Sequence, residues 1–492
     1  MGAWITALPI AFPILAGLCL LLVKFKDRKH RQMWVFPIIT INAIFALFAM
    51  HSGMAETFTL VHFTQKLSLT LYIDGLSKVF GTMVSVLWVI TTIYAFEYMT
   101  HEGREDQFFA FFTITFGVVL GIAFSGNFLT MYLFYEFLTL VTLPLVMHAM
   151  DNKARHAGKV YILYMMFGAA LAFIGFVFIY CYGTTTNFIL GGVLNTVLIA
   201  GHEAKLQLVF FVAFLGFGVK AAIFPLYRWL PKASVAPTPV TALLHAVAVV
   251  KSGVFAIIRL TYYSFGTDFL RNSTVQSLML LLTAITIVFG SAIALRTPHI
   301  KRRFAYSTVS NLSYILFGIA LMTPAGLVAA LLHMIYHAVL KITLFFTAGA
   351  LLYKTHREYL YEVEGFGKYM PVTFACMTVT GIGLVGIPPF AGFHSKWALA
   401  TAAVECGNPM SYFGIFALIL SALLTALYVF YILVRVYFPR NKVYPAGYYD
   451  HVEDPNGYMK YPMILLAITS VVLGFFPSLI LEVLGNMVMP LA

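Results

Sequence analysis

The sequence predicts an all-α polytopic membrane protein with about fourteen transmembrane helices, because of its composition and its long apolar runs. Of the 492 residues, 61% are hydrophobic and 10% are charged, and the mean hydropathy is +0.88. Soluble domains carry about 25% charged residues. A helix that spans a bilayer needs about 20 apolar residues. The chain offers such runs almost continuously, so we expect a single transmembrane domain over residues 1–492.

Apolar runs separated by charged residues, glycine or proline define the expected spans. In chain order they cover 3–23, 34–50, 76–95, 108–123, 127–147, 160–182, 206 to a break at 225, 240–260, 275–294, 304–322, 325–353, 370–403, 412–437 and 461–489. Two of them contain helix-breaking residues, the seventh at Pro225 and the twelfth at Pro388-Pro389, and each has a lysine near its break. Discontinuous helices in corresponding halves of a chain predict an inverted repeat with an ion site near the membrane midplane.

The 31 Lys and Arg residues are distributed asymmetrically over the expected loops. The loops after odd-numbered spans hold 22 of them, five lie in or beside loops on the other side, and four lie within spans. Since loops rich in Lys and Arg stay on the cytoplasmic side, we expect both termini on the non-cytoplasmic side of a prokaryotic cytoplasmic membrane or an organellar inner membrane. Topology therefore explains the net charge of +12, and nucleic acid is not expected as a partner. The first span lacks a basic n-region, which favours a retained helix over a cleaved signal peptide.

Three ionisable residues, His333, His337 and Lys341, lie within an apolar stretch at positions i, i+4 and i+8. On a helix they share one face and extend over about 12 Å of its axis. A charge at the membrane centre costs about 2.5–3.5 kcal/mol, so such side chains usually face water or one another. The row predicts a proton path. A buried polar cluster that only joins helices is the alternative.

Glu136 is the only acidic residue well inside an expected span, and Lys220 on the seventh span is its candidate partner. A carboxylate in hydrocarbon is either neutralised or held charged by a cation. The interaction between the two groups would depend on hydration and therefore on the position of the proton. A static buried ion pair is the alternative interpretation.

The four cations expected within spans are all lysines: Lys220, Lys251, Lys341 and Lys396. Lysine suits proton transfer because its protonation responds to burial, whereas arginine stays charged. Histidine titrates nearest to neutral pH, so His245 is a candidate bridge to Lys251, although a helix-packing role explains it equally well. His394 lies beside Lys396, and either an aqueous exit or a position near a loop explains it.

No cofactor or metal site is expected. The four cysteines are scattered singly, which indicates neither a disulfide framework nor a zinc or iron–sulfur site. A haem would need axial histidines that project towards a common centre, and His333 and His337 share one helix face instead. We therefore expect no redox or hydrolytic centre in this chain.

Four ordered motifs together resemble those of a known family. They are GVKAAIFPLYRWLPKASVAPTPVTALLHAVAVVKSGVFAIIR (218–259), HIKRRFAYSTVSNLSYI (299–315), HMIYHAVLKITLFFTAG (333–349) and GIPPFAGFHSKW (386–397). The chain resembles, over about 72–437, the antiporter-like proton-translocating subunits of respiratory complex I, Mrp-type cation/proton antiporters and energy-converting membrane-bound hydrogenases.

The resemblance implies fourteen helices with two inverted five-helix repeats, over about 108–260 and 275–437, broken helices 7 and 12, and flanking helices within 1–95 and 461–489. It implies proton-translocation roles for matched positions: Glu136, Lys220, His245, Lys251, His333, His337, Lys341 and Lys396. The histidine at 245 has a counterpart in only some branches of the family, so its role follows less directly.

The expected function is that of a proton-translocating, antiporter-like subunit of a complex I-like, membrane-bound hydrogenase-like or Mrp-type assembly. Its expected partners are other membrane subunits, including further antiporter-like ones, together with the lipid bilayer and H⁺, with Na⁺ left open. One alternative is an autonomous Na⁺/H⁺ antiporter, which a single midmembrane carboxylate supports weakly because Na⁺ prefers oxygen ligands. The other is a structural membrane anchor of a redox complex.

Overall fold

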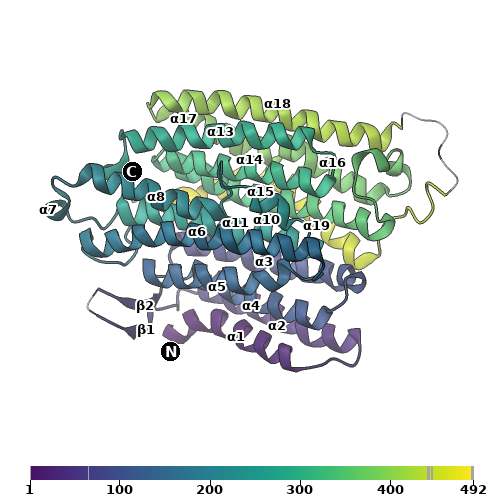
Figure 1. Ribbon diagram of the computed structural model, residues 1–492, viewed down its shortest axis with the longest axis horizontal. Coiled ribbons are helices and arrows are strands. Elements are labelled where there is room, and N and C mark those ends of the chain that lie inside the picture. The colour runs from purple at the N-terminus through teal and green to yellow at the C-terminus, as the bar shows by residue number, and fades with distance from the viewer. Residues whose placement is uncertain (1, 65, 440–443, 445–446, 489–492) are drawn as a thin grey trace.

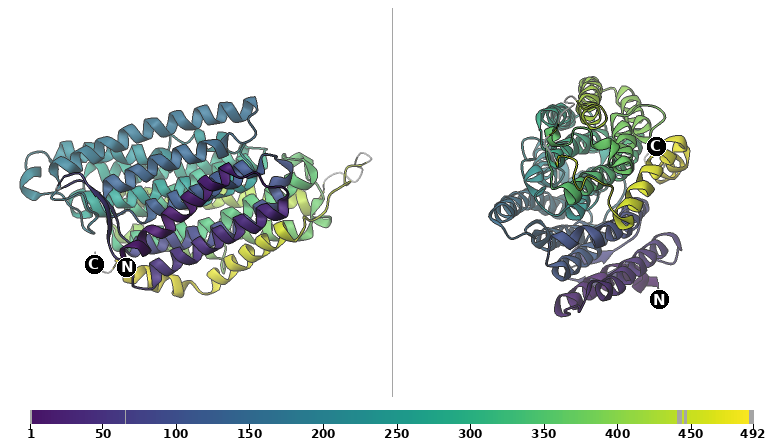
Figure 2. Two further views of the ribbon diagram at one scale, coloured as in Figure 1. Left: turned by 90° about the horizontal axis from the view of Figure 1, so that it is seen from below. Right: turned by 90° about the vertical axis from the view of Figure 1, so that its right-hand side faces the viewer.

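A bundle of long helices, packed roughly side by side, makes up the molecule (Figure 1). The computed structural model describes residues 2–64, 66–439, 444 and 447–488. The helices α1 (Gly2–Leu22) and α2 (Arg28–His51) lie at one edge of the bundle, and α18 (Pro409–Tyr437) lies at the opposite edge. Figure 2 shows the two described ends of the chain at the same end of the bundle.

The other helices follow in chain order. They are α3 (Gly75–Tyr98), α4 (Glu105–Ala123), α5 (Phe128–Val146), α6 (Asn152–Tyr182), α7 (Thr196–Ile199), α8 (Glu203–Lys220), α9 (Trp229–Ala233), α10 (Thr238–Ala246), α11 (Val249–Ile258), α12 (Thr267–Leu270), α13 (Thr274–Arg296), α14 (Ile300–Ala320), α15 (Pro324–Thr355), α16 (Pro371–Val385), α17 (Ala391–Glu405), α19 (Gly457–Phe475) and α20 (Pro477–Val488).

Eleven helical segments in the described residues are long and apolar enough to cross a membrane. This confirms the expected multi-pass, mainly helical membrane protein, while the number of fourteen spans stays a prediction. The helices α8 and α14 and the pair α16 and α17 occupy the positions of the three remaining expected spans, the seventh, tenth and twelfth. The helices α8 and α14 each carry three charged residues, and the pair is divided into two shorter helices.

Proline and glycine lie at two helix interruptions, one at the end of the seventh expected span and one near the middle of the twelfth. Between α8 and α9, Ala222 has a positive φ of 56°, and Pro225 has no N–H to donate to a helical hydrogen bond. Between α16 and α17, Gly386 caps the end of α16 with a φ of 86°, a conformation that glycine adopts without steric cost. The chain leaves the helical conformation at the two places where the sequence has these residues.

The expected span 240–260 differs from a single regular helix. It consists of α10 and α11, which are separated at Val247 and Ala248, and a π-helical segment, Arg259–Phe265, continues α11. This segment is buried throughout, although residues 261–265 lie outside the expected span. No glycine or proline marks the interruption, so the sequence contains no local signal for it.

The helix α15 lies in the middle of the bundle. In its most apolar segment 89% of the residues are buried, against 39% for the peripheral helix α6. It packs against α10, α14, α16, α17 and α19. The Thr323 side chain accepts a hydrogen bond from the Gly326 N–H at 3.0 Å and so caps its first turn. The row of ionisable residues on this helix therefore lies deep inside the protein.

A short antiparallel hairpin, β1 (Phe58–His62) and β2 (Ser68–Leu71), lies at the end of the bundle where α4 passes into α5. The Asn127 side chain donates a hydrogen bond to the Ser68 carbonyl oxygen at 2.8 Å and fixes the hairpin to this turn. The sequence reasoning had assigned no structure to this stretch.

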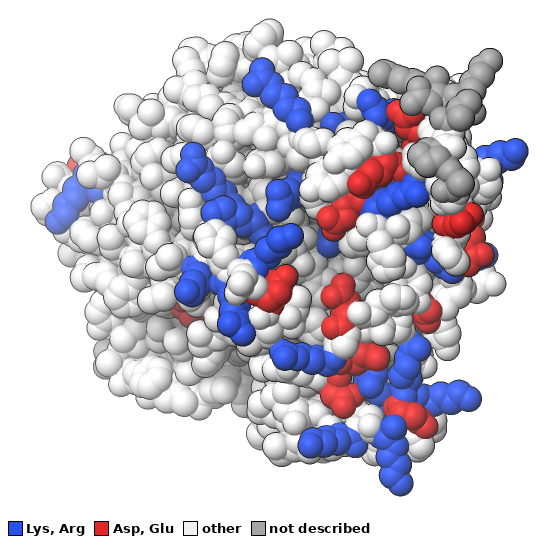
Figure 3. Space-filling view, turned by 45° about the vertical axis from the view of Figure 1, so that its right-hand side comes forward, with Lys and Arg blue, Asp and Glu red and all other residues white. Residues whose placement is uncertain are grey.

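The opposite end of the bundle is charged. Figure 3 shows Lys and Arg side chains gathered there, together with Asp and Glu. This end carries the loops after α1, α3, α5, α13 and α15, which are the loops expected to be basic.

Candidate functional site

Lys220 is the last residue of α8 and is buried. Its ammonium donates a hydrogen bond to the Tyr135 carbonyl oxygen on α5 and lies 3.3 Å from the centroid of the Tyr135 ring, where a cation is attracted by the face of the aromatic ring. The helix α11 also passes close by, because a Cβ at Gly253 would lie 2.7 Å from the Ala221 nitrogen. Lys220 thus lies where α5, α8 and α11 meet.

Glu136 follows Tyr135 on α5 and is half-buried. One of its carboxylate oxygens is buried without a hydrogen-bond partner among the described residues. Within that part of the chain, no ion pair of 4.0 Å or less joins Glu136 to a cation. Lys220 interacts with it electrostatically. The two groups are therefore neighbours without direct contact.

Lys251 is fully buried on α11. Its ammonium donates a hydrogen bond to the carbonyl oxygen of Met334 on α15. Met334 directly follows His333 in the chain, so this bond joins α11 to the row of ionisable residues on α15.

His333 joins α15 to α17. Its Nδ1 atom lies 2.9 Å from the hydroxyl oxygen of Ser395, and its ring stacks on Tyr314 with the centroids 5.2 Å apart. Its Nε2 atom is buried without a hydrogen-bond partner among the residues that the structure describes, a condition typical of sites that bind water or take part in chemistry. The ring of His337 follows one helical turn later, with a centroid separation of 6.0 Å.

Lys341 is buried at the end of the row and contacts α14. It donates hydrogen bonds to the Ser307 hydroxyl at 2.5 Å and to the Phe304 carbonyl oxygen at 3.1 Å. The Tyr428 hydroxyl on α18 donates to the same Ser307 oxygen at 2.7 Å. Sequence reasoning missed both hydroxyl residues, because serine and tyrosine are frequent in these helices and nothing in their spacing marks them.

Lys396 connects the two halves of the broken helix formed by α16 and α17. Its ammonium donates to the carbonyl oxygens of Leu384 and Val385, each at 2.8 Å. These are the last carbonyls of α16, where a cation is favoured by the partial negative charge of the helix end. A Cβ at Gly386 would lie 2.9 Å from the Lys396 side chain, so glycine gives the lysine room at this turn.

The two remaining histidines take different positions. His245 belongs to α10, but its side chain lies outside the described residues. His394 is half-buried on α17, next to Phe393, whose ring it meets edge to face at 5.6 Å.

These contacts form a lateral series through the bundle. Lys220 lies beside α11, Lys251 of α11 binds the backbone next to His333, and His333 binds the residue before Lys396. The lysines donate to carbonyl or hydroxyl oxygens, and a neutral amine also has N–H groups to donate. A lysine in this series could therefore lose a proton and keep its contact.

The buried cation Arg259 was not among the candidates from the sequence. It lies at the end of α11 and forms an ion pair with Asp74 at 2.5 Å, and it also donates to the Ser77 hydroxyl at 3.2 Å. The rings of Phe188, Phe255 and Tyr263 surround its guanidinium. The expectation that all cations within the spans are lysines was therefore incomplete.

Comparison with known families gives two matches. Residues 125–425 match the transmembrane model of the NADH:quinone oxidoreductase/Mrp antiporter family, and residues 62–109 match the model of the N-terminus of chain 5 of NADH-ubiquinone oxidoreductase (complex I).

Two curated relatives are each 28% identical to the chain over 97% of its length. They are NADH-quinone oxidoreductase subunit L of Rickettsia conorii and an Na(+)/H(+) antiporter subunit of Alkalihalophilus pseudofirmus. The chain spans 71% of the length of the first relative and 61% of the length of the second.

Two solved structures have the same fold. The membrane-bound sulfane sulfur reductase, an archaeal respiratory membrane complex, contains a chain with a TM-score of 0.83 and 24% identity, with 98% of this chain and 97% of that chain covered. The Mrp complex from Dietzia sp. DQ12-45-1b contains one with a TM-score of 0.82 and 20% identity, with 99% and 97% covered. The resemblance seen in the motifs is thus confirmed, and the chain belongs to the NADH:quinone oxidoreductase/Mrp antiporter transmembrane family.

Proposed function

We propose that this chain is a proton-translocating, antiporter-like subunit of a multisubunit membrane assembly of the complex I, Mrp or membrane-bound hydrogenase type. One observation carries the proposal: lysines and histidines follow one another from α8 through α11 and α15 to α17, and they contact neutral oxygens. Family membership supports the same function, since the relatives are named as subunits of an oxidoreductase and of an antiporter.

In the proposed mechanism, a change in one of the neighbouring subunits alters the interaction between Glu136 and Lys220. The proton affinity of Lys220 then changes, because the nearby carboxylate favours the ammonium form. The proton passes through Lys251 or water to the row on α15, which ends at Lys341. Lys396 controls its exit, so each site biases the next one electrostatically.

We extend the proposal to the architecture. The chain would cross the membrane fourteen times, with α8, α14 and the pair α16 and α17 adding three spans to the eleven apolar ones. Residues 108–260 and 275–437 would form the two inverted repeats. The basic end of the bundle would face the cytoplasm, which places both termini on the other side.

The partners would be further membrane subunits, and H⁺ would be the transported ion. His245 and His394 have no assigned step in this mechanism.

Replacement of Lys220 by alanine tests the proposal. We expect Lys220→Ala to reduce coupled proton transport by the whole reconstituted assembly to the level of protein-free vesicles, while the assembly itself stays intact. Transport is followed with a pH-sensitive dye inside the vesicles, and assembly by size-exclusion chromatography. Lys205→Ala is the matched control, because Lys205 lies on the same helix but is exposed. Normal pumping by Lys220→Ala would refute the role.

Two further measurements separate the alternatives. Transport of Na⁺ against H⁺ by the purified single chain in liposomes would favour an autonomous antiporter. Loss of assembly in the lysine variants, without a selective loss of transport, would favour a structural anchor.

A further inference from the structure

A cavity of about 590 Å³ opens at the charged end of the bundle, between the first turns of α6 and α14 and the segment that carries α9. Its lining includes four cationic side chains: Lys153, Arg228, Lys232 and Arg302. Within the described part of the chain, no Asp or Glu lines it.

The positive charges of this cavity have no directly paired carboxylate among the described residues. None of its four cations forms an ion pair of 4.0 Å or less with a described carboxylate. The Lys232 ammonium lies 3.4 Å from Nε2 of His156. The Asp151 carboxylate accepts a hydrogen bond from the Ala154 N–H at 2.6 Å and so caps the first turn of α6. Like charges held together in this way favour the binding of an external anion.

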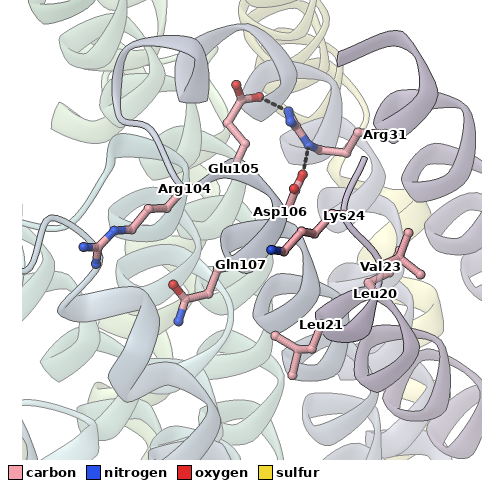
Figure 4. A pocket seen from close by; sticks show the side chains of 9 residues that line it. All are labelled: Leu20, Leu21, Val23, Lys24, Arg31, Arg104, Glu105, Asp106 and Gln107. Atoms are coloured by element: carbon pink, nitrogen blue, oxygen red, sulfur yellow. Dashed lines mark hydrogen bonds and ion pairs between the residues drawn. The ribbon is translucent and has the colours of Figure 1, made fainter. Parts of the chain in front are cut away.

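A second cavity on the same end shows the opposite arrangement. It has a similar volume, about 600 Å³, and lies between α1, α2 and the first turn of α4. Here Arg31 is ion-paired with both Glu105 and Asp106, at 2.6 Å to Asp106, so its charge is balanced within the chain (Figure 4). Among the described residues, the cavity beside α9 has no such carboxylate in its lining, so an anion from outside is the available counter-charge.

Apolar aromatic side chains continue from the cationic cavity towards the membrane interior. Tyr227 lines the cavity, and its ring lies 5.0 Å from that of Phe289 on α13. The ring of Phe224, in the break after α8, lies 4.9 Å from Phe289. Both phenylalanines are half-exposed. Phe289 lies seven residues before Arg296 at the basic end of α13, which places it about 10 Å deeper along the helix axis.

We propose that this cavity binds the headgroup of an anionic phospholipid, with an acyl chain lying along Phe224 and Phe289. Basic pockets at the ends of membrane helices bind such headgroups. The rings of Phe224 and Phe289 lie at the depth that the acyl chain of such a lipid would reach. A soluble phosphate would use only the cationic half of the site. An acidic protein segment would bind the cations but would make no use of the half-exposed rings of Phe224 and Phe289.

Lipid retention by a charge-removing double variant tests the site. The purified full-length chain in detergent is titrated with phosphatidylglycerol and with phosphatidylcholine, and bound lipids are counted by native mass spectrometry. For Arg228→Gln/Lys232→Gln we expect binding of one phosphatidylglycerol to weaken about 30-fold, which corresponds to the loss of two surface cations. Binding of phosphatidylcholine is expected to stay unchanged.

Two further variants keep the test decisive if the double variant folds poorly. Lys24→Gln/Arg104→Gln removes the same charge from the second cavity, and we expect it to retain the lipid. Arg228→Lys/Lys232→Arg preserves the charge and is expected to bind as the unmodified chain does.

Three results would overturn the proposal. The first is equal retention of phosphatidylglycerol by the double variant and the second-cavity control. The second is equally tight binding of glycerol phosphate, which would assign the site to a soluble anion. The third is unchanged lipid retention by the double variant together with loss of a neighbouring subunit when the same variant is purified as the whole assembly, which would assign the site to a protein partner.

Discussion

Arg259 and the four lysines of the candidate site are all cations within the helix bundle, but their partners differ. Arg259 is held by the Asp74 carboxylate at 2.5 and 2.9 Å and is enclosed by aromatic rings. The lysines donate to carbonyl or hydroxyl oxygens, and none of them lies within 4.0 Å of a carboxylate among the described residues: Lys220, Lys251, Lys341 and Lys396.

The difference separates a structural cation from candidate exchange sites. Removing the charge of Arg259 would leave the half-buried Asp74 carboxylate without its partner, which is costly. When a lysine that is bound to a carbonyl oxygen loses its proton, no charged partner group remains unpaired, because the carbonyl is neutral. Because arginine also stays charged at all relevant pH values, the Asp74–Arg259 contact is a static ion pair. A static ion pair was the alternative interpretation of Glu136 and Lys220.

The largest loss of stability is expected when the ion pair is broken. Asp74→Asn leaves Arg259 buried without a counter-charge and should lower the free energy of unfolding by about 3–5 kcal/mol. Equilibrium unfolding in mixed detergent micelles measures this change.

Asp151→Asn is the matched control for Asp74→Asn, because both aspartates cap the first turn of a helix and asparagine caps equally well. Asp151 has no arginine partner among the described residues, so its variant should unfold as the unmodified chain does.

Burial raises the pKa of Asp74, but Arg259 more than offsets this effect, so the pKa lies below its usual value. The contribution of the pair is therefore present above the ordinary aspartate pKa and is lost as the pH falls through the pKa of folded Asp74. Equal stability of the two variants would contradict the distinction between the two kinds of cation.

An intermediate effect is expected at the approach of α11 to Lys220. The Cβ of Gly253→Ala would lie 2.7 Å from the Ala221 nitrogen and 2.9 Å from the Lys220 Cβ, so the two helices must separate. Overpacking of this kind costs about 1–3 kcal/mol. Gly485→Ala is the control, because a Cβ there meets open space. We expect Gly253→Ala to lower both the free energy of unfolding and the rate of proton transport by the assembly. An unaltered transport rate would show that the spacing between α8 and α11 does not matter for transport.

The smallest effect on stability is expected where a lysine has only a neutral partner. Lys251→Met fills a similar volume and leaves only the Met334 carbonyl without its lysine, so the unfolding free energy should change by less than about 1 kcal/mol. Proton transport should nevertheless fall to background, since the series loses one member. Lys205→Met at an exposed position should change neither property. A large destabilisation by Lys251→Met would place this lysine with Arg259 as a structural cation.

Those features that depend on local signals could be predicted from the sequence. Hydropathy indicated the helical membrane class, and the residues around Pro225 and Gly386 marked the interrupted helices. The four ordered motifs were sufficient to identify the family. The interruption at Val247 and Ala248 could not be predicted, because these are ordinary apolar residues that fit a helix equally well.

The partners of the site residues could not be predicted for a different reason. Asp74 and Arg259 are 185 positions apart, and their contact depends on which helices pack together. The acceptors of Lys251 and Lys396 are backbone carbonyls, which every residue has, so no residue type signals them. The contact between His333 and Ser395 likewise follows from the packing of α17 against α15.

The buried indole of Trp229 joins the two sides of the interruption after α8. Its Nε1–H donates a hydrogen bond of 2.7 Å to the carbonyl oxygen of Val219, the residue just before Lys220. The short helix α9 is thereby attached to the last turn of α8, beside Lys220. One indole N–H therefore holds the two sides of this interruption in register, and the position of α9 helps to fix the position of the lysine.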